Sequence, residues 1–471
     1  MILGSAYYLA FVLVALLLYR LLPTRTLKYG WLTLASWGFY AAASPGYLWV
    51  IVLLTIIDYV AARRIAACET ETGRKRWLVL SIVSNLGLLA AFKYSGFATD
   101  SALAGLRCLG VTFEDRTWDL LLPLGISFHT FQGISYTVDV YRRQIPPVRS
   151  FLDYALFVAF FPQLAAGPIV RAAEFLPQMA SPPTPSGEQL QDGLRLVALG
   201  FFKKLFIADQ LHALFVGPAF AEPQLYGFAE LRWAAIAWTV QIYCDFSGYT
   251  DIALGTAKWF GFELPANFRL PFLATSIADF WRRWHLSLST WLRDYLYFPL
   301  GGSRGSAIRA SFNLLLVFIL CGLWHGAAWH WFWYGVYNGV LMNLHRVFDK
   351  AFAGAVWRRH WLWIAAAWLA TTYQLVVGLV FIRLETWAGA GRIWSALFGA
   401  TFTGDGGHGV PLAVYPLLLL GVLGHAAALV PRSGLVDRLA SWSRGWVEAA
   451  LLIALVVLSP GTVKSFLYIA F

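Results

Sequence analysis

The sequence predicts an all-α, polytopic membrane protein. Of its 471 residues, 59% are hydrophobic and only 13% are charged, and the mean hydropathy is +0.61. Soluble domains carry roughly 25% charged residues, so this chain is too apolar to be one. Apolar runs long enough to cross roughly 30 Å of hydrocarbon also recur along the whole chain.

The apolar runs predict about a dozen membrane-spanning helices. The longer runs are 5–22, 47–62, 77–92, 120–140, 231–256, 361–382, 411–430 and 447–470. The shorter runs are 30–43, 192–216, 308–322 and 326–347. The first run has neither a basic stretch before it nor a small-residue cleavage site after it, so we expect a retained span. No internal repeat divides the chain, and we expect residues 1–471 to form a single domain.

Basic residues predict the orientation of the early spans. They cluster at 20–28, 63–76 and 142–149, after the first, third and fifth runs, whereas acidic residues offset the basic ones in the 94–119 loop. The positive-inside rule then places the three basic clusters in the cytoplasm and the amino terminus outside. The same clusters account for much of the net charge of +11, so we expect no nucleic-acid binding.

Several common functional motifs are absent or out of context. The four cysteines are scattered and indicate neither a disulfide framework nor a zinc site. Glycines 404, 406 and 409 match a dinucleotide fingerprint, but they fall between two predicted spans rather than after a strand. No phosphate-binding loop, serine-hydrolase elbow or zinc-protease motif occurs, so ATPases and those hydrolases are not indicated.

Polar residues embedded between 120 and 345 are the informative part of the chain. The segment "FFPQLAAGPIVR", 160–171, has two prolines and a glycine at membrane depth, which predicts a broken or re-entrant segment. Ionisable groups such as Asp245 line a cavity or pair with one another inside a membrane. Asp279 is placed to pair with Arg282 or Arg283, a pattern that is more often structural than catalytic.

Two histidines stand in the aromatic segment "CGLWHGAAWHWFWYG", 321–335. His325 and His330 are five residues apart, so on a helix they do not share a face as a metal-binding pair would. Elsewhere, His285 lies one turn before Ser289, and a lone histidine of this kind is usually a packing residue with its hydrogen bonds satisfied. Gly335 and Gly339 form a G-x-x-x-G pattern that indicates close helix contact.

Four segments together resemble a known family. "FFPQLAAGPIVR", "YCDFSGYTDIALG", "FWRRWHLSLSTWLRDYLYFPLGG" and "GLWHGAAWHWFWYG", in this order, resemble the membrane-bound O-acyltransferase (MBOAT) family, in the branch that contains alginate O-acetylase. The resemblance is densest over 121–345. It implies the MBOAT fold, in which the spans and partial helices surround a central funnel.

The resemblance also assigns roles to individual residues. His325 matches the invariant histidine at the narrow end of the funnel, where donor and acceptor meet, and His285 matches a second active-site position. His330 matches no invariant position and stays a packing residue. Imidazole titrates near neutral pH and can act as a base toward a hydroxyl.

The remaining candidate residues concern substrate binding. Arg282, Arg283 and Arg293 suit the phosphates of acetyl-CoA. Asp245 and Ser289 are further substrate-binding candidates. No permanently bound cofactor and no metal are expected.

These implications predict an enzyme of the bacterial inner membrane that takes acetyl from cytoplasmic acetyl-CoA for O-acetylation of an exported polysaccharide. Alginate is the first choice of polymer, and cellulose, peptidoglycan and other exopolysaccharides stay open. A D-alanyl transferase for teichoic acid is a more distant relative. No external loop is long enough to be a soluble domain, so a separate periplasmic acetyltransferase of the serine-esterase-like (SGNH) type is expected as partner. The rival classes are a transporter or channel that uses Asp245, Asp279 and the histidines, and an inactive scaffold, against which the intact histidines argue.

Overall fold

The structure, a computed structural model, describes residues 5–111, 122–164, 167–399 and 409–427. Every regular element within these ranges is a helix, which confirms the predicted all-α class. The predicted span 447–470 and nearly all of the glycine-rich loop around 404–409 lie outside the described residues.

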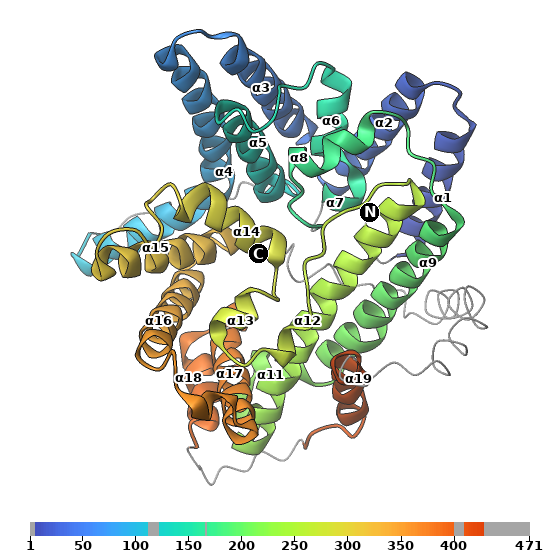
Figure 1. The fold of residues 1–471 in the computed structure, drawn as a ribbon. Helices are drawn as coiled ribbons and strands as arrows, with labels where there is room; N and C mark the ends of the chain where they lie inside the picture. Colours follow the sequence, from blue (N-terminus) through green and yellow to red (C-terminus); the bar gives the residue numbers. More distant parts are fainter. Residues whose placement is uncertain (1–4, 112–121, 165–166, 400–408, 428–471) are drawn as a thin grey trace.

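The first five helices follow the first five predicted runs, a sixth helix corresponds to no predicted run, and the six pack as one group, at the top of Figure 1. They are α1 (Ala6–Leu21), α2 (Arg25–Ala43), α3 (Leu48–Ala67), α4 (Glu71–Cys108), α5 (Ile126–Tyr141) and α6 (Phe151–Ala159). Hydroxyl groups of Ser5, Thr24 and Thr70 accept hydrogen bonds from the first turns of α1, α2 and α4, as N-cap residues do. Helices α3, α4 and α5 pack against one another, and α2 packs against α6.

Helix α4 is much longer than its predicted span of 77–92. The structure continues it to Cys108, so the first half of the predicted 94–119 loop is helical, and residues 112–119 lie outside the described part. Ten of the twenty residues 89–108 are alanine, leucine, lysine or arginine, which are good helix formers, and the scattered charges do not interrupt a helix.

The predicted break after α6 is confirmed. Three short helices, α7 (Phe161–Leu164), α8 (Ala172–Phe175) and the 3-10 turn η1 (Leu176–Met179), replace a continuous span there. Their surroundings are protein, since Phe160, Phe161 and Val170 have no exposed surface. Irregular backbone at membrane depth is tolerated when it is buried in this way.

A pair of long antiparallel rods forms the middle of the molecule (Figure 1). The first rod comprises α9 (Gly187–Phe201), the π-helical turn η2 (Phe202–Ala208), α10 (Asp209–Leu211), the π-helical turn η3 (His212–Val216) and α11 (Gly217–Ala221). After the turn η4 (Pro223–Leu225), α12 (Phe228–Trp259) returns beside it. The two backbones nearly touch at Gly200 and Gly248, where a side chain on either residue would lie within 2.7 Å of the other's carbonyl oxygen.

The rest of the described chain packs around α12 and a helical hairpin. Its elements are η5 (Pro271–Leu273), α13 (Ile277–Trp281), α14 (Leu286–Leu292), η6 (Arg293–Tyr297), α15 (Ala307–His325), α16 (Trp329–Ala351), η7 (Val356–Arg359), α17 (Trp361–Leu379), η8 (Val380–Arg383), α18 (Trp387–Leu397) and α19 (Val414–Ala427). Helices α15 and α16 form the hairpin, while α17, α18 and α19 pack on α12. A Cβ on Gly335 would lie 2.4 Å from the carbonyl oxygen of Phe318, which confirms the predicted close contact at this glycine.

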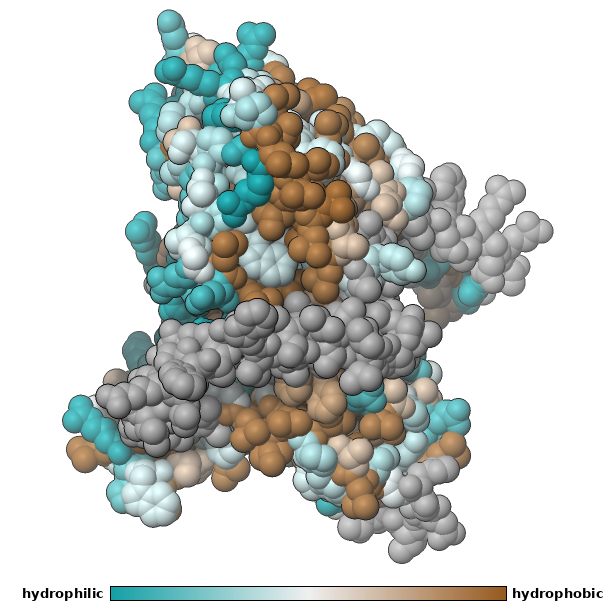
Figure 2. Space-filling model, turned by 90° about the vertical axis from the view of Figure 1, so that its right-hand side faces the viewer, coloured by the Kyte–Doolittle hydropathy of each residue, from teal (hydrophilic) through white to brown (hydrophobic). Residues whose placement is uncertain are grey.

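Length and composition identify three of the described segments as able to cross a membrane: Glu71–Cys108, Ala307–His325 and Trp361–Arg383. Large apolar side chains on them are exposed, for example Val83, Phe312 and Leu369, as a lipid-facing surface requires. Figure 2 shows hydrophobic residues gathered over the upper and lower parts of one face. The total of about a dozen spans stays a prediction.

Candidate active site

His325 is the last residue of α15, where the chain turns into α16. Gly326 and Ala328 have extended backbones, so the helix cannot continue through the turn. The His325 imidazole stacks on the indole of Trp331, the ring centroids lying 5.3 Å apart. The turn therefore places His325, a half-buried residue, at the end of α15.

His285 directly precedes α14 and is fully buried. Its backbone lies in the left-handed region (φ 45°, ψ 55°), which is costly for a residue other than glycine. Asn267 fixes this conformation: its carbonyl accepts from the N–H of Leu286 at 3.0 Å, and its side-chain oxygen accepts from the Ser287 hydroxyl at 2.7 Å. The imidazole meets the ring of Phe246 on α12 edge-on, at 4.8 Å.

The structure brings these two predicted histidines together although 40 residues separate them in the sequence. Their ring centroids are 6.1 Å apart, with the planes inclined at 40°. Trp324 lies beside both, 6.3 Å from the His285 ring and 4.9 Å from the His325 ring. A small acceptor group could contact both imidazoles across this distance.

His330, the second residue of α16, lies beside Trp331 with ring centroids 5.8 Å apart. It is partly buried on the surface of α16. Within the described residues, no group of three or more His, Cys, Asp or Glu side chains could hold a metal ion.

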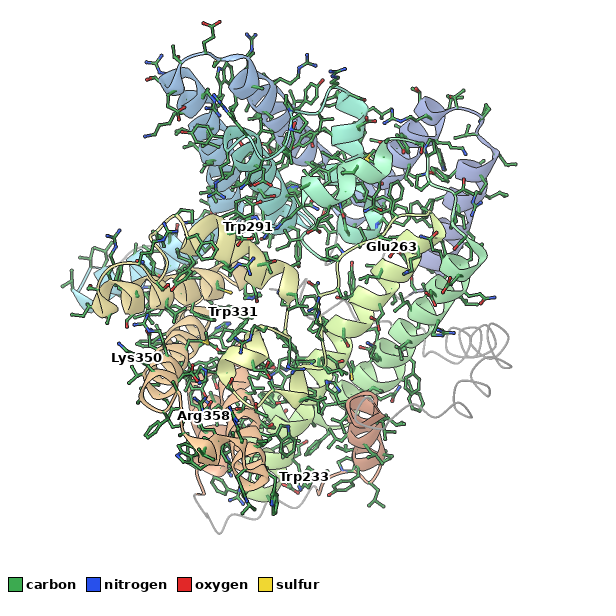
Figure 3. All side chains as sticks on the ribbon, in the orientation of Figure 1. Trp233, Glu263, Trp291, Trp331, Lys350 and Arg358 are labelled. Carbon is green, nitrogen blue, oxygen red and sulfur yellow. The ribbon has the colours of Figure 1, made fainter. Side chains whose placement is uncertain are left out.

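A row of aromatic rings leads away from the histidines. Trp324 stacks on Phe131 of α5 at 5.1 Å, Phe131 stacks on Trp291 of α14 at 3.7 Å, and Trp291 lies 5.3 Å from Tyr295. In Figure 3, Trp291 of α14 is labelled above Trp331 of α16. Stacked rings of this kind make a rigid, apolar wall.

Arginines surround the far end of the aromatic row. The guanidinium groups of Arg171 and Arg142 lie over the Tyr295 ring, 5.2 and 5.6 Å from its centroid. Asp294 binds both Arg171, at 2.6 Å, and Arg293, at 2.7 Å. Arg293, one of the predicted phosphate ligands, therefore belongs to a cluster with two arginines that the sequence reasoning did not select.

The other two predicted arginines lie one turn before His285. Arg283 pairs with Asp279 at 2.9 Å, as the spacing of these residues predicts. Arg282 is exposed. The Ser289 hydroxyl donates a 3.4 Å hydrogen bond to the carbonyl of Trp284, which occupies its donor within its own helical turn.

Asp245 forms an ion pair with Lys204, a partner that was not predicted from the sequence. It is 1% exposed in the middle of α12 and lies 2.6 Å from the ammonium of Lys204 in η2. Lys204 also lies 2.9 Å from Asp209. This buried pair ties the two central rods together, and a substrate-binding role of Asp245 stays a prediction.

Lys93 and Tyr94 of α4 reach the site and were not selected from the sequence. The Lys93 ammonium donates to the carbonyls of Trp324 and His325, the latter at 3.0 Å. The Tyr94 hydroxyl donates to the carbonyl of Leu323 at 2.7 Å. A lysine that follows the apolar run 77–92 was the available signal, because such a charge inside a membrane protein needs a partner.

Comparison with known proteins gives a consistent result. The model of the membrane-bound O-acyltransferase (MBOAT) family matches residues 141–380, a stretch that contains both histidines. The probable alginate O-acetylase AlgI of Pseudomonas aeruginosa is 39% identical over 368 residues, which cover 78% of this chain and 69% of the relative.

Two further relatives have names that refer to other polymers. The peptidoglycan O-acetyltransferase of Helicobacter pylori is 36% identical over 396 residues, covering 78% of this chain and 73% of the relative. The teichoic acid D-alanyltransferase of Bacillus subtilis is 30% identical over 279 residues, covering 56% of this chain and 67% of the relative.

Proposed function

Because the chain belongs to the membrane-bound O-acyltransferase family and is an O-acyltransferase, we propose that it moves acetyl from cytoplasmic acetyl-CoA to an exported polysaccharide. We place it in the bacterial inner membrane. The observation that carries the proposal is the pairing of His285 with His325 at a ring separation of 6.1 Å. A base and a second polar group at this distance suit acyl transfer to a hydroxyl.

His325 acts as the base in this proposal. Its imidazole takes the proton of the acceptor hydroxyl while that oxygen attacks the thioester carbonyl. The new ester C–O bond forms as the C–S bond breaks, and the thiolate leaves as CoA thiol after the imidazolium returns the proton. His285 orients the acceptor or stabilises the negative charge that develops on the carbonyl oxygen.

A covalent route uses the same two residues. In that route His325 itself attacks the thioester and carries the acetyl group until the acceptor hydroxyl removes it. Rapid acid quenching followed by mass spectrometry distinguishes the routes, since only the covalent one places acetyl on His325.

The arginines are proposed to bind the phosphates of the donor. Arg293 and its neighbours Arg142 and Arg171 gather around Asp294, and the aromatic row connects this cluster to the histidines. Guanidinium groups suit phosphate because several N–H donors point in one plane. Arg282 and Arg283 precede α14, whereas Arg293 follows it, and they add to the same electrostatic attraction from the opposite end of this helix.

Alginate is the first choice of acceptor polymer. The relatives named for alginate and for peptidoglycan differ by only three percentage points in identity, so similarity alone does not separate the two polymers. Cellulose and other exopolysaccharides are further candidates, and transfer of D-alanine to teichoic acid is a more distant one. Acetylation of a panel of purified polymers by membranes that contain the protein would identify the acceptor.

Delivery to a bulky external polymer is proposed to need a separate periplasmic acetyltransferase of the SGNH type. The purified chain alone should then label small acceptors but acetylate polymer slowly. Full-rate polymer acetylation by the purified chain in liposomes would exclude this partner.

The experiment that tests the proposed function separates an enzyme from a transporter. Proteoliposomes receive acetyl-CoA labelled in the acetyl group, and covalent label is measured on protein and acceptor. The proposal predicts covalent transfer that requires the folded protein. Passage of unmodified acetyl-CoA or ions through a folded protein, without covalent transfer, would support the transporter instead.

A further inference from the structure

The last turn of α15 has four carbonyl groups that no helical N–H can reach, as every helix end does. The structure satisfies all four. The N–H of Gly326 donates to the carbonyl of Gly322 at 3.3 Å, and the Tyr94 hydroxyl donates to the carbonyl of Leu323. The two remaining carbonyls, at Trp324 and His325, both accept from the ammonium of Lys93.

Lys93 brings an amino group to this helix end, and that group is a cation when it is protonated. The ammonium lies 6.0 Å from the Trp324 ring centroid, and no carboxylate pairs with it in the part of the chain that the structure describes. A cation at a helix C-terminus is stabilised by the partial negative charge of the unpaired carbonyls. The Lys93 side chain therefore binds the carbonyls of Trp324 and His325.

We propose that Lys93 is a positioning residue for acyl transfer, which holds the backbone of His325 so that its imidazole stays in place opposite His285. This inference rests on the proposed function. Helix ends fray when their carbonyls lack partners, and the χ angles of a terminal residue move with its backbone. The Lys93 side chain reaches from α4 to the end of α15 and prevents this fraying at His325, the proposed base.

Tyr94 provides the matched control within the same cap. Its hydroxyl binds the Leu323 carbonyl, two residues before His325, and carries no charge. Tyr94→Phe removes one cap hydrogen bond but leaves the carbonyls of Trp324 and His325 bound to Lys93. A purely structural cap predicts similar consequences for the two positions, whereas a positioning role predicts a rate loss only at Lys93.

The test compares Lys93→Met, Lys93→Arg and Tyr94→Phe with the wild type in the full-length chain. The measurements are kcat and KM for acetyl transfer from labelled acetyl-CoA in proteoliposomes, each normalised to folded protein. A displacement of about 1 Å at a catalytic group costs about 100-fold in rate, so Lys93→Met should lower kcat by about 100-fold with little change in KM. Lys93→Arg restores two N–H donors and should recover about tenfold, the worth of a charged hydrogen bond. Tyr94→Phe should stay within about threefold of wild type.

Three results would overturn the inference. One is a folded Lys93→Met protein with kcat near that of wild type, and another is an equal loss in Tyr94→Phe. The third is a Lys93→Arg protein that folds as well as Lys93→Met and recovers no rate. A wild-type protein that transfers no acetyl group would refute the proposed function, and with it this inference, in a pattern distinct from these three.

Discussion

Gly322→Ala tests whether the hairpin of α15 and α16 positions the reaction centre. Gly322 lies one turn before His325, on the face of α15 that contacts α16. A Cβ at this position would lie 2.2 Å from the carbonyl oxygen of Trp331 and 3.1 Å from the N–H nitrogen of Gly335. Both are backbone atoms, so no side chain can rotate away, and the two helices must separate.

The size of the effect follows from the geometry. Ordinary contacts of a Cβ begin at 3.4 Å, so the helices must move apart by roughly 1 Å at Trp331. Overpacking of this kind costs about 1–3 kcal/mol, against about 1 kcal/mol gained by replacing glycine with alanine in a helix. The His325 imidazole stacks on the ring of Trp331. A displacement of Trp331 by 1 Å should therefore lower the transfer rate by about 100-fold.

The assay measures thermal unfolding in detergent and acetyl transfer in proteoliposomes for the same preparations. Gly87→Ala in α4 is the control, since no atom lies within 4 Å of a Cβ built there. The control should keep its rate and unfold at the same temperature or slightly higher. A Gly322→Ala protein with the stability and rate of the control would refute the close packing on which the site geometry depends.

Other predictions concern the central ion pair and the topology. Asp245→Asn leaves Lys204 with Asp209 as its carboxylate partner among the described residues and should cost about 3 kcal/mol, seen as a lower folded yield with normal specific activity; a well-folded but inactive variant would return Asp245 to the substrate site. Thr72 and Gly105 lie roughly 50 Å apart along α4, more than the hydrocarbon thickness. In a background without native cysteines, a cysteine at Gly105 should react with an impermeant reagent outside intact cells and one at Thr72 should not; labelling of position 72 would invert the topology.

Long apolar runs made much of the fold predictable. The run 47–62 became α3 and the run 231–256 became α12, because an apolar segment of that length can bury its backbone polar groups only as a helix. The extension of α4 to Cys108 was not predicted, because the charged residues after the apolar run were interpreted as a loop. Charged residues indicate exposure, but they do not end a helix. The π-helical turns η2 and η3 leave no local sequence pattern either.

The site was predictable only in part. His285 and His325 were selected through the family resemblance, whereas the local pattern favoured a packing role for a lone histidine such as His285. The contact of Lys93 with His325 joins residues more than 200 positions apart, and no periodicity encodes such a pairing. Likewise, the partner of Asp245 was not predicted, because Lys204 lies on another helix. Ionisable residues in apolar segments identify which side chains need partners, but the tertiary structure decides which partners they have.

The most direct test of the central claim is acetyl transfer by His325→Ala, measured together with its folded yield. Removal of a base or acetyl carrier should lower the rate by about two to four orders of magnitude while the protein still inserts and folds. His285→Ala should lower the rate less, and His330→Ala should change mainly the folded yield. A well-folded His325→Ala protein that transfers acetyl at a near-normal rate would contradict the catalytic assignment and the mechanism built on it.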